Sequence, residues 1–179
     1  MGGGDKPLLE VGGAAMLARV IAALRDDADA VAISANGDPA RFARFGQPVL
    51  DDGPFNDEGP LAGVLAGLAW AHANGATALL TVPGDTPFAP RGLTAALAPA
   101  PACAASHGQP HHLVALWPVA CRDELRTLLS MPGRRDVAGF AHAIGMRVVD
   151  FPAAKWDPFL NVNTPEDLAL ARAVAEGKT

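Results

Sequence analysis

The apolar positions of the chain fall into short uninterrupted runs, a pattern typical of buried strands. The clearest run covers residues 78–82 in ATALLTVPGD, another covers residues 31–35 in ADAVAISAN, and a shorter one covers residues 48–51. Runs of this length without alternating polar residues suit strands that are covered on both faces of a sheet. Three more strands are predicted later in the chain, in PACAASHG, HHLVALWPV and MRVVDF.

Between these runs, apolar residues recur at helical spacing. Leucines and β-branched residues form one stripe in AAMLARVIAALRDDA and another in GPLAGVLAGLAWAHANG, and shorter helices are predicted in CRDELRTLLSM and RRDVAGFAHAIG. The final helix has the clearest start. In TPEDLALARAVAEG, Thr164 is the expected N-cap, Pro165 takes the first helical position, and Asp167 completes a capping box.

Strands that alternate with helices predict βαβ units and a mainly parallel sheet, and hence an α/β fold. In a doubly wound sheet the opening strand lies near the centre, and a glycine-rich loop follows it into a helix. Here the glycine-rich stretch begins at Gly2, and the strand that should precede it is missing. We expect one domain over residues 1–179, with a nucleotide half of roughly residues 1–100 and an acceptor half of roughly residues 101–179.

Composition narrows the functional classes. The net charge of −5 argues against a nucleic-acid-binding surface, which needs a clustered basic face. No apolar stretch reaches transmembrane length and no signal peptide is recognisable, so we expect a cytoplasmic protein without a membrane partner. Cys103 and Cys121 have no metal-ligand spacing and are expected to be reduced core residues.

The opening MGGGDKPLLEVGG is the first candidate site. Gly2, Gly3 and Gly4 would let backbone N–H groups approach a ligand closely, and Lys6 would supply the positive charge that a triphosphate needs. The spacing is not that of a Walker A loop. The alternative is a frayed terminal tail, but the PLLEVGG continuation leads directly into a helix.

Asp85, in VPGDTPF, follows the strongest predicted strand. Open α/β sheets bind their ligands at the carboxyl ends of their strands. A single carboxylate there suits Mg²⁺, which binds one or two carboxylates together with substrate phosphates. The alternative is that the PGD and DTP sequences are turn chemistry alone.

Two further strand ends carry polar residues. Asn36, in SANGD, could hydrogen-bond a base or ribose, although Asn-Gly is also a strong turn signal. Asp51 and Asp52 end the next strand, where an acid could accept hydrogen bonds from the N1–H and exocyclic amine of a purine. The alternative is a pair of solvated loop acids.

The later part of the chain offers two amides and two arginines. Asn161 and Asn163, in FLNVNTPEDL, have the donors and acceptors that a pterin or a base edge requires. Arg134 and Arg135 could clamp a phosphate, or could belong to a solvated helix start. The five histidines form no metal or catalytic pattern.

Together, MGGGDKPLLEVGG, SAN, DDGPFNDEGPLAG, PGDTPF and FLNVNTPEDL resemble the molybdenum cofactor guanylyltransferases, in the family's order and over nearly the whole chain. The resemblance implies a three-layer α/β/α sandwich, Rossmann-like, with a mostly parallel sheet. It implies transfer of GMP from GTP to molybdenum-molybdopterin, with Mg²⁺ as cofactor. Molybdenum-insertion proteins and molybdoenzyme chaperones are implied as transient partners.

The resemblance also implies roles for the candidate residues. Gly2 and Gly3 match the GTP-binding loop and Lys6 the phosphate-contacting lysine. Asp85 matches the magnesium-binding aspartate. The remaining positions match contacts to GTP (Asn36, Asp52), to the pterin side (Asn161, Asn163) and to the acceptor phosphate (Arg134, Arg135).

This sequence departs from the family pattern at its start. In the family, a strand and a loop of the type LAGGxSxRM come before GGxDK, and Met1 stands where the methionine of that loop should be. We therefore expect the chain to begin late. Two other functions stay open on the sequence: a cytidylyltransferase that uses CTP, and a carrier that binds finished cofactor without catalysis.

Overall fold

A computed structural model describes residues 6–133, 135–152 and 155–178. The helices are α1 (Met16–Leu24), α2 (Pro60–Ala73), α3 (Leu93–Leu97), α4 (Arg122–Ser130), α5 (Val137–Ala143) and α6 (Pro165–Ala175). The strands are β1 (Glu10–Val11), β2 (Ala14–Ala15), β3 (Ile33–Ser34), β4 (Val49–Leu50), β5 (Ala78–Thr81), β6 (Ala102–Ser106), β7 (Gln109–Pro118) and β8 (Arg147–Asp150). Short 3-10 helices cover Lys6–Leu8, Pro39–Phe45, Gly53–Phe55 and Val119–Cys121.

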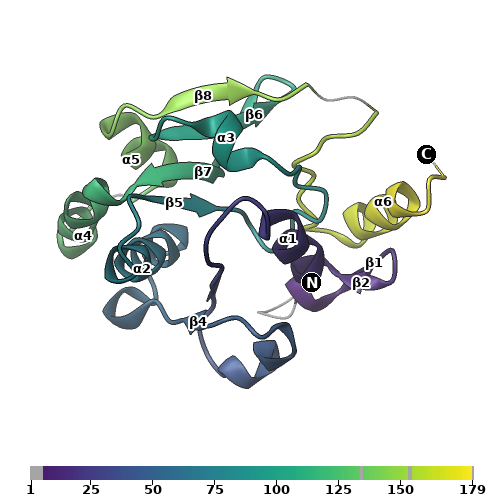
Figure 1. Ribbon diagram of the computed structural model, residues 1–179, viewed down its shortest axis with the longest axis horizontal. Coiled ribbons are helices and arrows are strands. Elements are labelled where there is room, and N and C mark those ends of the chain that lie inside the picture. Colours follow the sequence, from purple (N-terminus) through teal and green to yellow (C-terminus); the bar gives the residue numbers. More distant parts are fainter. Residues whose placement is uncertain (1–5, 134, 153–154, 179) are drawn as a thin grey trace.

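The central strands form two separate sheets. β3 and β4 pair in parallel, and a four-stranded sheet has the order β5-β7-β6-β8 (Figure 1). Within the larger sheet β8 runs parallel to β6, whereas β7 is antiparallel to both β5 and β6. The α/β class that the sequence predicts is confirmed. The four-stranded sheet is mixed, so the prediction of a mainly parallel sheet is wrong there: two of its three strand pairs are antiparallel.

A tight hairpin explains the direction of β7. His107 and Gly108 join β6 to β7 with φ angles of 49° and 73°. Positive φ at both positions of a two-residue loop is characteristic of a hairpin turn, and such a turn makes the next strand antiparallel. The apolar pattern of HHLVALWPV predicts a strand correctly, but it carries no information on that strand's direction.

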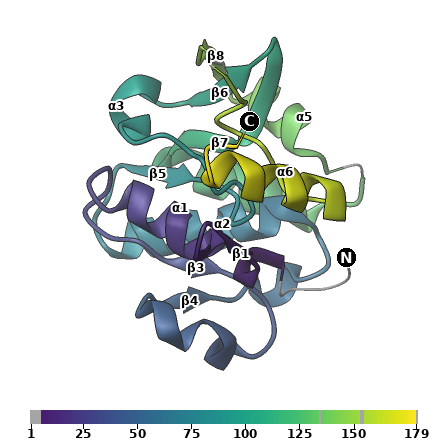
Figure 2. The same ribbon diagram turned by 90° about the vertical axis from the view of Figure 1, so that its right-hand side faces the viewer.

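The alternating side chains of the strands face two apolar layers. Cys103, Ala115 and Trp117 pack with residues of α2, α4 and α5, whereas Ala102 and Leu116 pack with residues of α1 and α3. Because successive strand residues point to opposite faces, each strand contributes to both layers. The result is the three-layer sandwich, with helices on both sides of the sheet (Figures 1 and 2).

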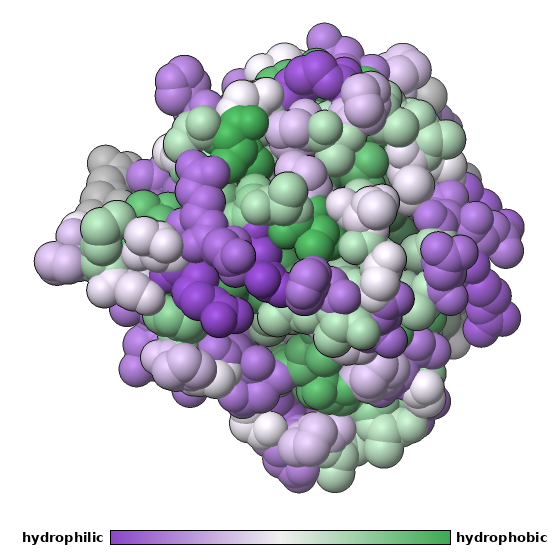
Figure 3. All heavy atoms as spheres, turned by 60° about the vertical axis from the view of Figure 1, so that its left-hand side comes forward, coloured by the Kyte–Doolittle hydropathy of each residue, from purple (hydrophilic) through white to green (hydrophobic). Residues whose placement is uncertain are grey.

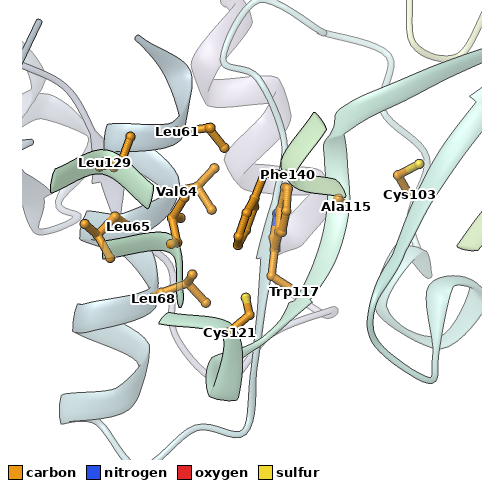
Figure 4. Packing of buried hydrophobic residues seen from close by; sticks show 11 residues of the cluster. Leu61, Val64, Leu65, Leu68, Cys103, Ala115, Trp117, Cys121, Leu129 and Phe140 are labelled. Carbon is orange, nitrogen blue, oxygen red and sulfur yellow. The ribbon is translucent and has the colours of Figure 1, made fainter. Parts of the chain in front are cut away.

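The core under α2 is built around two stacked aromatic rings. The centroids of Trp117 and Phe140 are 6.1 Å apart at an interplanar angle of 18°, and leucines of α2 pack beside them (Figure 4). The indole N–H of Trp117 donates to the Thr81 hydroxyl at 2.8 Å, and that hydroxyl donates to the Leu113 carbonyl at 2.9 Å. The polar atom of this fully buried side chain is therefore satisfied.

The last helix packs beside the first hairpin. Val11 and Met16 form an apolar cluster with Val162 and Ala171, and the Arg172 guanidinium donates to the Glu10 carbonyl at 3.2 Å. Figure 1 shows α6 next to the β1–β2 hairpin. This contact brings segments from opposite ends of the chain together at one edge of the molecule.

The face drawn in Figure 3 carries hydrophilic and hydrophobic residues in small interleaved patches. None of the helices formed by residues 6–133, 135–152 and 155–178 is both long and apolar enough to span a bilayer.

Both cysteine thiols should be unreactive in the folded protein. They are buried and free of disulfides, and burial raises the pKa of Cys103. Burial, with the nearby Glu124 carboxylate, raises the pKa of Cys121 to about 11. A raised pKa lowers the thiolate fraction at a given pH, so at pH 8 only about one Cys121 in a thousand is nucleophilic.

We expect an aromatic disulfide reagent to titrate two thiols in urea and none within minutes under native conditions. Rapid native labelling at either position would contradict the buried placement.

Candidate functional site

Lys6 connects three segments at the carboxyl end of β5. Its ammonium group forms an ion pair with the Asp85 carboxylate and donates to the Asn163 side-chain oxygen at 2.7 Å. The side chains of Lys6 and Asp85 are 21% and 14% exposed, so the pair is largely shielded yet open to a ligand. Partial shielding strengthens the interaction of these charges with a bound anion or cation.

The local sequence holds Asp85 at this position. The N–H of Thr86 donates to the Pro83 carbonyl at 3.2 Å, which closes a turn directly after β5. The Asp85 carbonyl accepts the N–H of Val162 at 3.0 Å, and the Thr86 side chain is buried. The turn chemistry and the charged side chain therefore coexist: the backbone makes the turn, and the carboxylate faces Lys6.

The cap of α6 holds Asn163. The Asp167 carboxylate accepts the backbone N–H groups of Asn163 at 2.9 Å and Thr164 at 2.8 Å, and the Thr164 hydroxyl accepts the N–H of Asp167 at 3.1 Å. The predicted capping box is confirmed. The hydrogen bond from Asn163, followed by those from Thr164, lowers the pKa of Asp167 below its ordinary value. From the sequence, the capping box is expected only to start α6. In the structure it also positions Asn163.

Asn161 lies on the same segment but has a different side-chain contact pattern. Asn161 and Asn163 are both exposed, and Val162 between them is fully buried. Of the two predicted asparagines, only Asn163 makes a side-chain contact with Lys6.

A second pair joins the ends of β3 and β4. The Asn36 amide donates to the Asp52 carboxylate at 2.7 Å, and its oxygen accepts the N–H of Asp52 at 3.0 Å. The two strands are parallel neighbours, so their carboxyl ends bring these residues together. Asp51 instead accepts the N–H of Gly53 at 2.7 Å, which makes it the turn residue of the two acids. The Ser34 hydroxyl adds a long hydrogen bond to Asp52 at 3.4 Å.

One residue of each group borders a common cavity. A space of about 1440 Å³ lies between β3 and β5, and Lys6 and Asn36 both line it, whereas Asp52, Asp85 and Asn163 do not. Lys6 and Asn36 therefore mark two points on the wall of one cavity.

The remaining predicted residues are placed as follows. Gly2, Gly3 and Arg134 lie outside the described residues. Arg135 forms an ion pair with Glu58 and donates to the Met131 carbonyl at 2.5 Å and 3.2 Å. In this arrangement Arg135 ties the loop before α5 to the loop before α2.

One polar cluster has no counterpart in the sequence analysis. The Ser106 hydroxyl donates to the Asp157 carboxylate at 2.7 Å, so the His111 ring nitrogen 2.7 Å away must be the donor to Ser106. His111 also packs against Phe159 at 5.0 Å, and burial lowers its pKa. Ser106 is buried, so this cluster anchors the segment before α6 to the sheet and is no nucleophile.

The donors around Lys6 fit a divalent cation together with substrate phosphates. The ammonium group already occupies a position where a carboxylate oxygen and an amide oxygen converge. Within residues 6–133, 135–152 and 155–178, no three acidic, histidine or cysteine side chains gather closely enough to form a metal site alone. A hard cation such as Mg²⁺ needs only one or two carboxylates when phosphates complete its shell.

Comparisons with known proteins point to one family. Residues 1–144 match the family model of the MobA-like NTP transferase domain. The molybdenum cofactor guanylyltransferase of Acidiphilium cryptum (strain JF-5) is 58% identical over 173 residues, covering 97% of this chain and 88% of the relative. The molybdenum cofactor guanylyltransferase of Rhodopseudomonas palustris (strain BisB5) is 46% identical over 184 residues, covering 98% and 88%.

Solved structures show the same fold at low sequence identity. Molybdopterin-guanine dinucleotide biosynthesis protein A from Archaeoglobus fulgidus superposes with a TM-score of 0.69 at 19% identity, covering 98% of this chain and 92% of that one. A 4-diphosphocytidyl-2C-methyl-D-erythritol synthase from Anaerococcus prevotii DSM 20548 gives 0.72 at 13% identity, covering 97% and 94%.

Removing the Thr164 hydroxyl should destabilise α6 and loosen Asn163. Thr164→Ala should cost about 1 kcal/mol of unfolding free energy, the usual effect of losing an N-cap side chain. Thr164→Ser keeps the hydroxyl and is the matched control. The measurement is urea unfolding of both variants, and equal stability of Thr164→Ala and the parent protein would contradict the capping role.

Proposed function

The chain belongs to the MobA-like NTP transferase family, within the molybdenum cofactor guanylyltransferases, and we propose that it transfers GMP from GTP to molybdenum-molybdopterin. One observation carries the assignment of the chemistry to this site. The Lys6 ammonium, the Asp85 carboxylate and the Asn163 amide meet at the carboxyl end of β5. This is the edge at which α/β sheets bind nucleotides.

In this reaction a terminal phosphate oxygen of molybdopterin attacks the α-phosphorus of GTP. A new P–O bond forms while the bond to the bridging oxygen of the β-phosphate breaks, and pyrophosphate leaves. Negative charge grows on the phosphate oxygens, so catalysis depends on positioning and on fixed positive charge. Lys6 supplies that charge by exchanging its contact with Asp85 for a contact with the triphosphate.

Asp85 is the proposed ligand of Mg²⁺, with the Asn163 oxygen next to it. Enzymes of this class generally use a divalent metal, and the bound ion would neutralise phosphate charge. Once Lys6 turns to the phosphates, the Asp85 carboxylate is left without its cation. Asp85 would hold a metal ion there, and such an ion would supply positive charge to balance the carboxylate in this largely shielded site.

The Asn36–Asp52 pair is the proposed reader of the guanine base. A carboxylate accepts hydrogen bonds from both the N1–H and the exocyclic amine of guanine, and cytosine lacks that pair of donors. The two hydrogen bonds between Asn36 and Asp52 hold the carboxylate in a fixed orientation. Preorganisation of this kind lowers the cost of binding.

The acceptor side is assigned to Asn161 and Asn163 for the pterin, and to Arg134 and Arg135 for its phosphate. Gly2 and Gly3 are assigned to the triphosphate. For Arg135 the proposal requires that a phosphate replaces Glu58 as the partner of the guanidinium. We place the reaction in the cytoplasm, with molybdenum-insertion proteins and molybdoenzyme chaperones as transient partners.

Lys6→Ala should weaken binding of GTP because it removes the side-chain charge nearest the phosphates. Loss of one charge-assisted contact corresponds to about 1.5–3 kcal/mol, or roughly a 10- to 150-fold rise in the dissociation constant. Isothermal titration with GTP measures the effect. Lys178→Ala is the matched control, because Lys178 is an exposed lysine paired with Glu176.

An unchanged GTP affinity in Lys6→Ala would show that the phosphates bind elsewhere. Competition with CTP belongs to the same experiment. Displacement of GTP by CTP at equal concentration would contradict guanine reading by Asp52 and favour a cytidylyltransferase.

Asp85→Asn should abolish most of the turnover while leaving the fold intact, because the amide keeps the shape but loses the charge that binds a metal. We expect pyrophosphate release with GTP and molybdenum-molybdopterin to fall at least about 100-fold. The thermal midpoint should fall modestly, because Lys6 loses its charged partner, while the affinity for the product should stay close to that of the parent chain. Undiminished turnover would contradict the assignment of Asp85 as a metal ligand. If the parent chain bound product without releasing pyrophosphate, the protein would be a carrier.

A further inference from the structure

Two different partners hold the guanidinium group of Arg135. Its Nε and Nη2 groups donate to the Met131 carbonyl at 3.2 Å and 2.5 Å. Its Nη1 group forms an ion pair with the carboxylate of Glu58, which comes from the loop between β4 and α2. The group therefore has a neutral partner four positions away in its own segment and a charged partner on a distant loop.

The contact with Met131 orients the guanidinium group without help from Glu58. Met131 and Arg135 both belong to the connection between α4 and α5, and two donors on one carbonyl oxygen set the plane of the group. The helix that follows is capped, because the Asp136 carboxylate accepts the N–H of Gly139 at 2.8 Å. Arg135 thus keeps its orientation when the carboxylate leaves.

Glu58 is the partner that can leave. Its side chain is 32% exposed, against 17% for Arg135, so the carboxylate reaches water by rotating outwards. Its backbone stays in place, because the N–H of Glu58 donates to the Phe55 carbonyl at 2.9 Å and Phe55 packs against the core under α2. Ion pairs with this much exposure are weak, so another anion can replace the carboxylate at low cost.

The loop that carries Glu58 begins at Asp52. The N–H of Phe55 donates to the Asp52 carbonyl at 3.2 Å, and Glu58 donates in turn to Phe55, so two consecutive turns join Asp52 to Glu58. Asp52 is also the partner of Asn36 at the ends of β3 and β4. Arg135 therefore contacts the loop that starts at the proposed reader of the guanine base.

We propose that Glu58 is an internal competitor for a phosphate group at Arg135: its carboxylate occupies the position of the anion and must be displaced before the phosphate binds. That this phosphate belongs to the acceptor rests on the proposed function. A terminal phosphate carries a charge of about −1.5 to −2 at pH 7 and binds a guanidinium group through charge-assisted hydrogen bonds. It carries more charge than a carboxylate and can displace Glu58.

The same competition favours release of the product. The attacking oxygen of the acceptor phosphate gives up its negative charge to the new P–O bond, and the leaving pyrophosphate carries that charge away. The acceptor phosphate is then one half of a diphosphate bridge and keeps one negative charge. Glu58 therefore competes against a weaker anion after the reaction than before it, and it returns to Arg135 as the product leaves.

The first test follows anion binding at Arg135 itself. Inorganic phosphate is titrated into the parent chain and into Glu58→Gln, and the Nε–H resonance of Arg135 is followed by NMR. Loss of the competing charge should lower the dissociation constant of phosphate about 3- to 10-fold. Asp57→Asn is the matched control, because it removes an exposed acid from the same loop, and it should change the constant less than about twofold.

An unchanged or raised dissociation constant in Glu58→Gln would overturn the competition. An equal fall in Asp57→Asn would also overturn it, because the effect would then come from the general charge of the loop. The titration of Glu58→Gln decides the proposal without any variant of Arg135.

The second test measures pyrophosphate release. Glu58→Gln should lower the KM for molybdenum-molybdopterin about 3- to 10-fold and leave the KM for GTP unchanged, which a loosened loop would not do. In Arg135→Gln the KM for the acceptor should rise, and adding Glu58→Gln should then have no further effect, because the two residues act as a pair. A lower KM in the double variant than in Arg135→Gln would show that Glu58 acts elsewhere and would overturn the proposal.

The two tests also separate this inference from the proposed function. Tighter phosphate binding in Glu58→Gln with an unchanged KM for the acceptor would support the competition at Arg135 and contradict Arg135 as the acceptor site. A chain that releases no pyrophosphate would contradict the proposed function, and the phosphate titration would still decide the role of Glu58.

Discussion

The site depends on one constraint: a single ammonium group must be balanced by oxygens that come from distant parts of the chain. Lys6 lies near the start, Asp85 follows the middle strand, and Asn163 precedes the last helix. A half-shielded charge left without partners is costly, so the three segments favour the arrangement in which they meet. The apolar contact of α6 with the first hairpin helps to place Asn163, and the turn after β5 helps to place Asp85. Under the proposed function, an anionic substrate would take over Lys6 from Asp85 by an exchange of partners.

Much of this architecture follows from local patterns in the sequence. The uninterrupted run before Asp85 predicts a strand, and the end of such a strand is where an α/β sheet presents its ligands. The spacing of Thr164, Pro165 and Asp167 predicts the start of α6 to the residue. These predictions succeed because each depends on residues that are close in sequence. Similarly, Asn36 and Asp52 can each be assigned to a strand end before the structure is known.

The structural features that the sequence does not predict depend on pairing between distant segments. The direction of β7 is set by positive φ at His107 and Gly108, and a positive φ at a residue other than glycine is uncommon. The sequence alone does not distinguish Asp51 from Asp52. In the structure, Asp52 is the hydrogen-bond partner of Asn36, and Asp51 is the turn residue. The short helix Leu93–Leu97 has too few residues for a periodic signal. The Ser106–His111–Asp157 cluster spans 51 residues and has no motif.

The distance in sequence between Lys6 and Asn163 has a consequence for how the protein folds. Their hydrogen bond closes a separation of 157 positions, almost the whole chain. Contacts of such high contact order carry the largest loop-closure entropy and form late. During translation, the strands and helices around Trp117 can associate well before α6 leaves the ribosome. Under the proposed function, the Lys6–Asp85–Asn163 cluster would therefore be complete only after α6 has docked.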